Sequence, residues 1–261
     1  MAKVGIDWPN KSAWVIVRGA SIPLYWKEPH QFLAGMTLVA LGAYQDKRMG
    51  FEDFLATLGP DGRGASWLRD LEESGLVRRI GTILSQNGLT KDLETPVGSA
   101  HQFNMCRLLY VICRAARPET VVETGVGVGT SSAFILQALN HNDRGSLYSV
   151  ERVKMGLTGL LVRGELKERW HLTIGKSSDE LPKIVNDREI DIFLHDSEHS
   201  NQNMLFEYGI AWPKIRESGY LLSDDIVDNF SFFRFSSRLE SDLNVVVDDF
   251  GIVRKRTTVR T

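Results

Sequence analysis

The sequence predicts an α/β protein built around a Rossmann-like, doubly wound sheet that is mostly parallel and ends in an antiparallel strand. Three observations predict this fold. From about residue 100 onward, short apolar runs typical of strands alternate with helical stretches, which is the pattern of a parallel sheet. The first of these runs leads into a loop with alternating glycines at 125, 127 and 129. The last two runs, 244–247 and 251–254, are separated by only three residues, which favours a terminal antiparallel hairpin.

Length and composition set the broad class. The chain has 261 residues and a net charge of −2, which fits one large or two smaller domains and provides no overall basic field for nucleic acid. Its two cysteines, Cys106 and Cys113, lie seven positions apart on one predicted helix and are expected to be reduced core thiols. No apolar run has membrane-spanning length and no secretory leader is recognisable. We therefore expect a cytoplasmic protein with no membrane partner.

Residues 1–95 are expected to form a smaller, mainly helical domain in front of the sheet domain, which we assign to 96–261. The expected elements are a hairpin or covering arm (13–17 and 22–26), helices (31–46, 50–59 and 65–75) and a strand (76–80). This order resembles a winged-helix unit, which serves some regulators in DNA binding and some O-methyltransferases in dimerisation. A helical lid is an equal alternative. Arg78, Arg79 and Lys91 supply little charge for a nucleic-acid partner, so a homodimer through this region is the expectation.

In the second domain the expected elements follow one another with short connections. Strands are predicted at 120–123, 146–150, 171–174, 190–194, 219–223, 244–247 and 251–254. Helices are predicted at 103–116, 130–140, 155–168, 178–186 and 199–215, with a further one after Phe230. Because the carboxyl ends of parallel strands meet at one edge of the sheet, we expect the ligands to bind there.

The glycine loop carries the first functional signal. Glycines allow a tight turn and a close approach of the backbone to a nucleotide. A dinucleotide fingerprint would need glycine or alanine at Thr130, whereas the third glycine is Gly129. The stretch from Glu123 to Gly129, acid-x-Gly-x-Gly-x-Gly, instead resembles motif I of class I S-adenosylmethionine-dependent methyltransferases. The resemblance implies that Glu123 orients the cofactor amino group. It also implies cofactor contacts along the loop, from Thr124, Gly125, Gly127, Gly129, Thr130 and Ser131.

Two later strand ends complete the expected cofactor site. Glu151 ends the second strand, where a carboxylate can accept both hydroxyls of a ribose, and Arg152 follows it. After the third strand, the loop Gly175-Lys-Ser-Ser lies beside the adenine in the resembling family. That implies a base contact from Ser177 or Lys176, although Ser177 or Ser178 can alternatively cap the following helix.

Carboxylates at the ends of the fourth and fifth strands indicate the reaction. Asp196 follows one strand, and Asp224 with Asp225 follow the next. Acids that converge at one edge repel one another unless a cation joins them, and hard oxygen ligands suit Mg²⁺ or another hard divalent cation. This spacing resembles the metal-dependent O-methyltransferases of the catechol and the sugar or antibiotic types. The resemblance implies that Asp196, Asp224 and Asp225 bind the metal and that Asp196 also contacts the cofactor.

The expected activity is metal-assisted O-methylation of a small molecule with vicinal hydroxyls, such as a phenol, a sugar or a natural product. The base position, three residues after Asp196, holds His199 in this chain and lysine in the catechol type. The expected catalytic residues are therefore His199 and Asp196. Three alternatives remain open: an NAD-type oxidoreductase, a winged-helix DNA-binding regulator with a ligand-sensing domain, and a relative that uses the same fold for other chemistry.

Overall fold

The computed structural model describes residues 3–7, 12–17, 20–25, 45–58, 63–90, 95, 97–227 and 229–258. Three N-terminal strands form a small antiparallel sheet: β1 (Lys3–Asp7), β2 (Ser12–Val17) and β3 (Ala20–Tyr25). The expected hairpin is thus present, with one additional strand. The predicted helix 31–46 lies almost wholly outside the described residues, which resume with a 3₁₀ turn, η1 (Gln45–Lys47).

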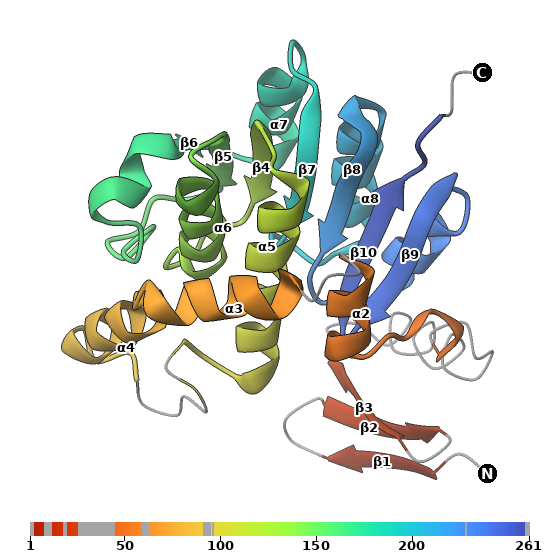
Figure 1. Ribbon diagram of the computed structural model, residues 1–261. Coiled ribbons are helices and arrows are strands. Elements are labelled where there is room, and N and C mark those ends of the chain that lie inside the picture. The colour runs from red at the N-terminus through yellow and green to blue at the C-terminus, as the bar shows by residue number, and fades with distance from the viewer. Residues whose placement is uncertain are drawn as a thin grey trace.

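The remaining strands form one sheet with the order β6-β5-β4-β7-β8-β10-β9 (Figure 1). They are β4 (Thr120–Thr124), β5 (Ser146–Glu151), β6 (Trp170–Ile174), β7 (Ile190–His195), β8 (Ile215–Ser223), β9 (Ser241–Val247) and β10 (Phe250–Lys255). All neighbours are parallel except β10, which is antiparallel to β8 and β9. The predicted fold class, a mostly parallel Rossmann-like sheet with a C-terminal antiparallel hairpin, is confirmed.

Helices cover both faces of this sheet (Figure 1). They are α5 (Ala100–Ala116), α6 (Thr130–Asn142), α7 (Ser177–Val185), α8 (Asn201–Ala211) and α9 (Ser231–Ser236), with 3₁₀ segments η2 (Gly164–Arg169) and η3 (Trp212–Lys214). Strand residues alternate between the two hydrophobic cores: Val121 packs on the side of α5 and α6, and Val122 on the side of α7 and α8. The doubly wound arrangement therefore follows from strands that are apolar on both faces.

Three helices precede the sheet domain: α2 (Phe51–Thr57), α3 (Arg63–Glu73) and α4 (Leu76–Gln86). The predicted strand 76–80 is wrong, because this stretch is the first half of α4. The buried residues Leu76, Ile80 and Leu84 recur every four positions and so form one helical face. They belong to the same core as α5 and α6. This region therefore packs directly on the sheet domain, and no wing strand occupies residues 76–80.

One smaller difference concerns a loop. The predicted helix 155–168 is a series of turns followed by η2, which begins only at Gly164. The predicted helix after Phe230 is confirmed as the short helix α9, and its members Phe232 and Phe233 are buried in the core. None of the helices that the structure describes has the length and apolar character that a membrane crossing requires.

Candidate active site

The glycine loop joins β4 to α6 and has positive φ at all three glycines. A Cβ at Gly125 would lie 1.8 Å from the carbonyl oxygen of Asp196, and one at Gly129 would lie 3.1 Å from the Cα of Gly159. At Gly127 a Cβ would meet nothing within 4 Å. Gly125 and Gly129 are therefore needed for close backbone packing, whereas Gly127 borders open space.

Glu151 ends β5 beside this loop. Its Oε2 accepts hydrogen bonds from the backbone N–H groups of Val126 and Gly127, both at 3.0 Å. Partial burial tends to raise the pKa of Glu151, but the hydrogen bonds from Gly127 and Val126 outweigh it and lower the pKa below its usual value. The carboxylate is consequently ionised and held in place by the loop that it faces.

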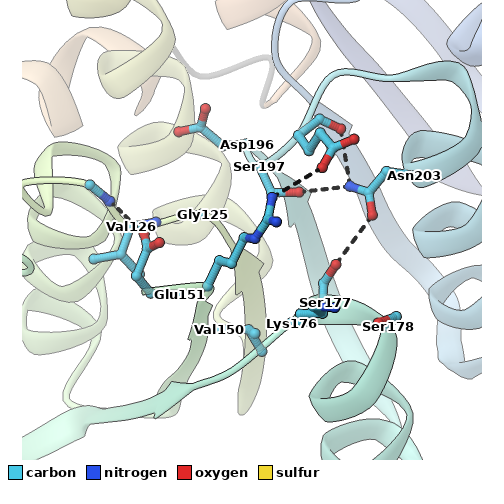
Figure 2. A pocket seen from close by; sticks show the side chains of 13 residues that line it. Gly125, Val126, Val150, Glu151, Lys176, Ser177, Ser178, Asp196, Ser197 and Asn203 are labelled. Atoms are coloured by element: carbon cyan, nitrogen blue, oxygen red, sulfur yellow. Dashed lines mark hydrogen bonds and ion pairs between the residues drawn. The ribbon is translucent and has the colours of Figure 1, made fainter. Parts of the chain in front are cut away.

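A cavity of about 490 Å³ lies over the ends of β4, β5 and β7 (Figure 2). Of the residues predicted to bind the cofactor, six line it: Gly125, Gly127, Glu151, Arg152, Ser177 and Asp196. Lys176, the alternative to Ser177 for the base contact, lines it as well. The other lining residues were not predicted: Val126, Val150, Ser178, Ser197, Glu198 and Asn203. The volume and mixed polarity are those of a site for a small molecule.

Five predicted cofactor residues do not line this cavity: Glu123, Thr124, Gly129, Thr130 and Ser131. Glu123 is fully buried, and its carboxylate accepts hydrogen bonds from three hydroxyls, those of Ser131 and Ser132 (both 2.6 Å) and Ser149 (2.8 Å). Burial raises the pKa of Glu123, and these hydroxyls oppose the rise. In this structure Glu123 ties β4 to α6 and β5, and its contact with a cofactor stays a prediction.

A buried carboxylate that was not predicted lies behind the cavity. Glu207 of α8 is closed to solvent, and its oxygens lie 2.6 Å from His195 Nδ1 and 2.5 Å from the Thr124 hydroxyl. It also accepts hydrogen bonds from Ser197 Oγ (2.9 Å) and Asn203 Nδ2 (3.0 Å), which both line the cavity. Nothing in the local sequence distinguishes Glu207 from an exposed helical glutamate, because all its named partners except Asn203 come from β4, β7 and the loop after β7.

Ser177 lies where the resemblance placed a base contact. It is the first residue of α7, and its hydroxyl donates to Asn203 Oδ1 at 3.3 Å. The alternative prediction, a helix cap at Ser177 or Ser178, is wrong: the N-cap is Lys176, and its side chain makes no capping hydrogen bond. The Ser177 side chain is thus part of the cavity wall.

The predicted metal-binding aspartates lie at the carboxyl ends of the adjacent parallel strands β7 and β8. The backbone N–H of Asp224 donates to His195 O at 3.0 Å, and that of Asp196 to Thr124 O at 2.9 Å. Burial, followed by the charges of Asp224, Glu123 and Asp225, raises the pKa of Asp196 well above its usual value. Negative charge is therefore concentrated at this edge of the sheet, as the sequence predicted.

Two further residues join this acidic group. His101, in the first turn of α5, has Nε2 3.2 Å from Asp224 Oδ1, and its Nδ1 contacts Asp249 Oδ1. Burial tends to lower the pKa of His101, but the hydrogen bond to Asp224 and the charge of Asp249 raise it to about 9. His199, the predicted base, has Nε2 3.6 Å from Asp225 Oδ2 and an imidazole that is 13% exposed. The aspartates after β8 thus have a histidine on either side.

Comparison with known proteins identifies the domain. Residues 122–226 match the model of a methyltransferase domain family. They contain the ends of β4, β5 and β7, over which the cavity lies.

Residues 122–226 form a methyltransferase domain.

Among curated proteins no significant match to this sequence was found. Solved structures match the fold of the methyltransferase domain. An O-methyltransferase from Bacillus cereus in complex with SAH has a TM-score of 0.52 at 16% identity, over 70% of this chain and 91% of that one. A methyltransferase from Geobacter sulfurreducens has a TM-score of 0.52 at 18% identity, over 76% and 98%. TomG from Streptomyces achromogenes, in complex with SAM, has a TM-score of 0.51 at 16% identity, over 70% and 90%. These likenesses show that the fold is shared.

Proposed function

We propose that the methyltransferase domain transfers a methyl group from S-adenosylmethionine to a hydroxyl of a small molecule with vicinal hydroxyls, assisted by a divalent cation. One observation carries the proposal. Asp196 lines the cavity that contains Glu151, and it also belongs to the acidic group formed with Asp224 and Asp225. A cofactor in the cavity and an acceptor held at the acidic group would therefore meet at Asp196.

The cavity lining fits an adenosyl group. The ionised carboxylate of Glu151 is an acceptor suited to ribose hydroxyls. On another side, Ser177 and Asn203 supply hydroxyl and amide groups suited to a base edge, and the Glu207 carboxylate orients Asn203 from behind. When bound, S-adenosylmethionine supplies a methyl group on a positively charged sulfur, and nearby carboxylates favour that charge. The named O-methyltransferases with SAH or SAM bound support the same assignment.

The acidic group fits a divalent cation. Asp196, Asp224 and Asp225 supply oxygen donors at neighbouring strand ends, where burial, followed by the charges of nearby carboxylates, raises the pKa of Asp196. These residues would hold the cation. Bound there, it would lower the pKa of an acceptor hydroxyl and fix its orientation. The preference for vicinal hydroxyls follows because two adjacent oxygens can chelate one cation.

Removal of the acceptor proton is assigned to His199. Its Nε2 lies 3.6 Å from Asp225 Oδ2, next to the acidic group, and an imidazole has the right basicity to accept a proton near neutral pH. Asp196 is the second candidate, since its raised pKa makes it a better base than an ordinary aspartate. The two residues can be separated by substitution.

The test is methyl transfer measured as SAH formation by mass spectrometry, with a catechol and a vicinal sugar diol as acceptors. We expect transfer in the presence of Mg²⁺ or Mn²⁺ and loss of transfer in EDTA, while SAH binding survives. Asp196→Asn and Asp224→Asn should abolish transfer, and the exposed Asp179→Asn should match the wild-type protein. Full transfer in EDTA would reject the role of the cation. Absence of SAH binding would reject the proposal as a whole.

A further inference from the structure

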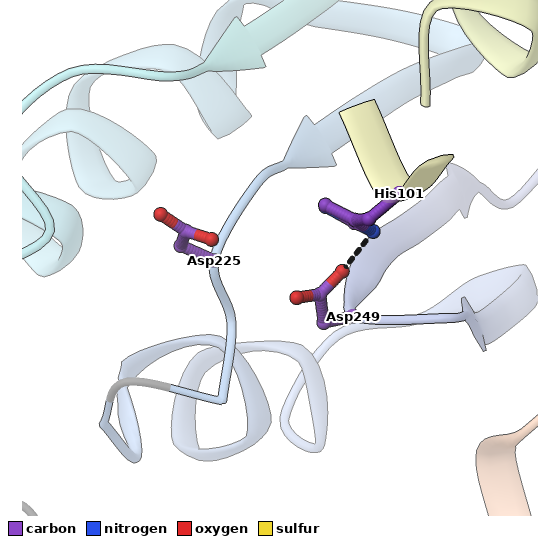
Figure 3. Close-up of side chains that lie close together, drawn as sticks. All are labelled: His101, Asp225 and Asp249. Carbon is purple, nitrogen blue, oxygen red and sulfur yellow. Dashed lines mark ion pairs between the residues drawn. The ribbon is translucent and has the colours of Figure 1, made fainter. Parts of the chain in front are cut away.

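Figure 3 shows a cluster of potential metal ligands that differs from the predicted set. In the part of the chain that the structure describes, one group of His, Cys, Asp and Glu side chains has ligand atoms all within 4.8 Å of one another: His101, Asp225 and Asp249. It shares Asp225 with the predicted set and includes neither Asp196 nor Asp224. Two residues with no assigned role, His101 and Asp249, are therefore the new members.

The three ligands come from parts of the chain that are distant in sequence. His101 belongs to the first turn of α5, which is fixed by Ser99, whose hydroxyl accepts from the Gln102 N–H at 3.1 Å. Asp225 follows β8, and Asp249 lies in the turn between β9 and β10. The backbone N–H of Ile226 donates to Asp249 O at 3.3 Å and so ties these two loops together. The backbone thus holds the three side chains near one another.

Two of the three side chains are largely shielded from water: the exposed fraction is 29% for His101 and 17% for Asp249, whereas Asp225 is 42% exposed. Asp249 Oδ1 is closed to solvent and is paired with the ring nitrogen Nδ1 of His101. Asp224, 14% exposed, adds a further carboxylate 3.2 Å from the other nitrogen of the same ring. A half-buried group with more carboxylates than cations is unfavourable unless a further cation joins it.

We propose that His101, Asp225 and Asp249 bind a divalent transition-metal ion of the series Mn²⁺ to Zn²⁺ in preference to Mg²⁺. The donor set gives the reason. Carboxylate oxygens suit Mg²⁺, Ca²⁺ and Mn²⁺, whereas an imidazole nitrogen suits transition metals such as iron, nickel and zinc. A site with one nitrogen and two carboxylates therefore selects against Mg²⁺, which takes oxygen ligands and keeps much of its water.

The inference rests on the proposed function in one respect: the ion is taken to be the one that assists methyl transfer. Asp225 belongs to both residue sets, so His101 and Asp249 would replace Asp196 and Asp224 as the other ligands of that ion. His101 and Asp249 are then ligands that the resemblance to metal-dependent O-methyltransferases did not supply. Binding of the metal ion requires no methyl transfer, so it can be measured on the full chain without an acceptor.

The experiment uses metal-free protein titrated with Mn²⁺ and, separately, with Mg²⁺. We expect Mn²⁺ to bind at least tenfold more tightly than Mg²⁺. His101→Ala and Asp249→Asn should each weaken Mn²⁺ binding at least tenfold, since loss of even an outer partner of a metal ligand costs 10–100-fold. The matched controls are Asp248→Asn, in the same turn, and His171→Ala, at an exposed position of β6. Both should bind Mn²⁺ like the wild type. Affinity for SAH should be unchanged in all four.

A spectroscopic measurement on the wild-type protein tests the proposed ligands even if a variant fails to fold. Pulsed electron paramagnetic resonance of bound Mn²⁺ should show coupling to an imidazole ¹⁴N, and the coupling should be absent from His101→Ala. If the Mn²⁺ spectrum shows no nitrogen and only Asp196→Asn or Asp224→Asn abolishes binding, the inference is wrong and the three-aspartate site of the proposed function stands. If no divalent ion binds while SAH does, both metal assignments fail.

Discussion

The backbone nitrogen of Gly127 lies 3.0 Å from Oε2 of Glu151, so the central glycine of the loop holds the carboxylate at the end of the next strand. The same oxygen accepts from Val126. The glycine loop and the predicted ribose acid are therefore one structural unit. This relationship gives Glu151 a defined position and a lowered pKa before any ligand binds.

Glu151→Gln should weaken SAH binding about tenfold and Glu151→Ala by up to about 100-fold. A hydrogen bond to a charged group contributes about 1.5–3 kcal/mol, and the glutamine keeps one acceptor oxygen without the charge. Isothermal titration calorimetry with SAH measures the effect. The exposed Glu168→Ala is the control. Equal SAH affinity in Glu151→Ala and wild type would remove Glu151 from the cofactor site.

Gly125→Ala and Gly127→Ala should differ sharply in stability, although both glycines have positive φ. At Gly125 the new Cβ would meet the Asp196 carbonyl oxygen at 1.8 Å, so the strand end must move. We expect a loss of more than about 3 kcal/mol in the free energy of unfolding. At Gly127 the space is open, and only the backbone cost of about 1–2 kcal/mol remains. Urea unfolding of the two variants tests this, and equal losses would contradict the loop geometry.

Glu207 should make stability depend on pH in the acid range. Burial opposes ionisation, but His195 and the other donors lower its pKa from 4.5 to about 2. A carboxylate with a lower pKa in the folded state stabilises the fold above its unfolded pKa, and this contribution is lost as pH falls from about 4.5 towards 2. The contribution at pH 7 is on the order of 3 kcal/mol.

The matching variant is Glu207→Gln, compared with the exposed Glu168→Gln. The difference in unfolding free energy between wild type and Glu207→Gln should be largest above pH 5 and should shrink steadily towards pH 2. Glu168→Gln should follow the wild type throughout. A wild-type to Glu207→Gln difference that stays constant over this range would show that Glu207 is not an ionised partner of His195.

Ile80→Ala should destabilise the whole domain. Ile80 is 1% exposed and belongs to the core shared with α5 and α6, and truncation of a buried isoleucine costs about 2–5 kcal/mol. Thermal unfolding should remain a single transition at a lower midpoint, while the exposed Ser85→Ala on the same helix should match the wild type. Two separate transitions, with only the earlier one shifted, would instead describe an independent N-terminal domain.

The sheet could be predicted because its strands carry local signals. Runs such as 190–194 are largely apolar, and each is bounded by turn or helix residues, so the fold class and the positions of the strands along the chain followed from the sequence pattern. The prediction of a strand at 76–80 was wrong because Leu, Val and Ile suit a short strand as well as a helix. Only the continuation of the apolar spacing to Leu84 distinguishes the two.

The candidate site could be predicted only where its residues follow a strand directly. Glu151 and Asp196 come at strand ends and were found in this way. Glu207 and Asp249 could not be found, because their partners come from elements far apart in the sequence. Glu123 shows the opposite case: its place in a motif suggested a cofactor contact, whereas in the folded chain three hydroxyls surround its carboxylate.

The most direct test of the central claim is calorimetric titration of the wild-type protein with SAH and, in parallel, with NADH. The account predicts that SAH binds with one site per chain, that NADH produces no binding heat, and that Glu151→Ala weakens the SAH isotherm. Binding of NADH together with no detectable binding of SAH would contradict it.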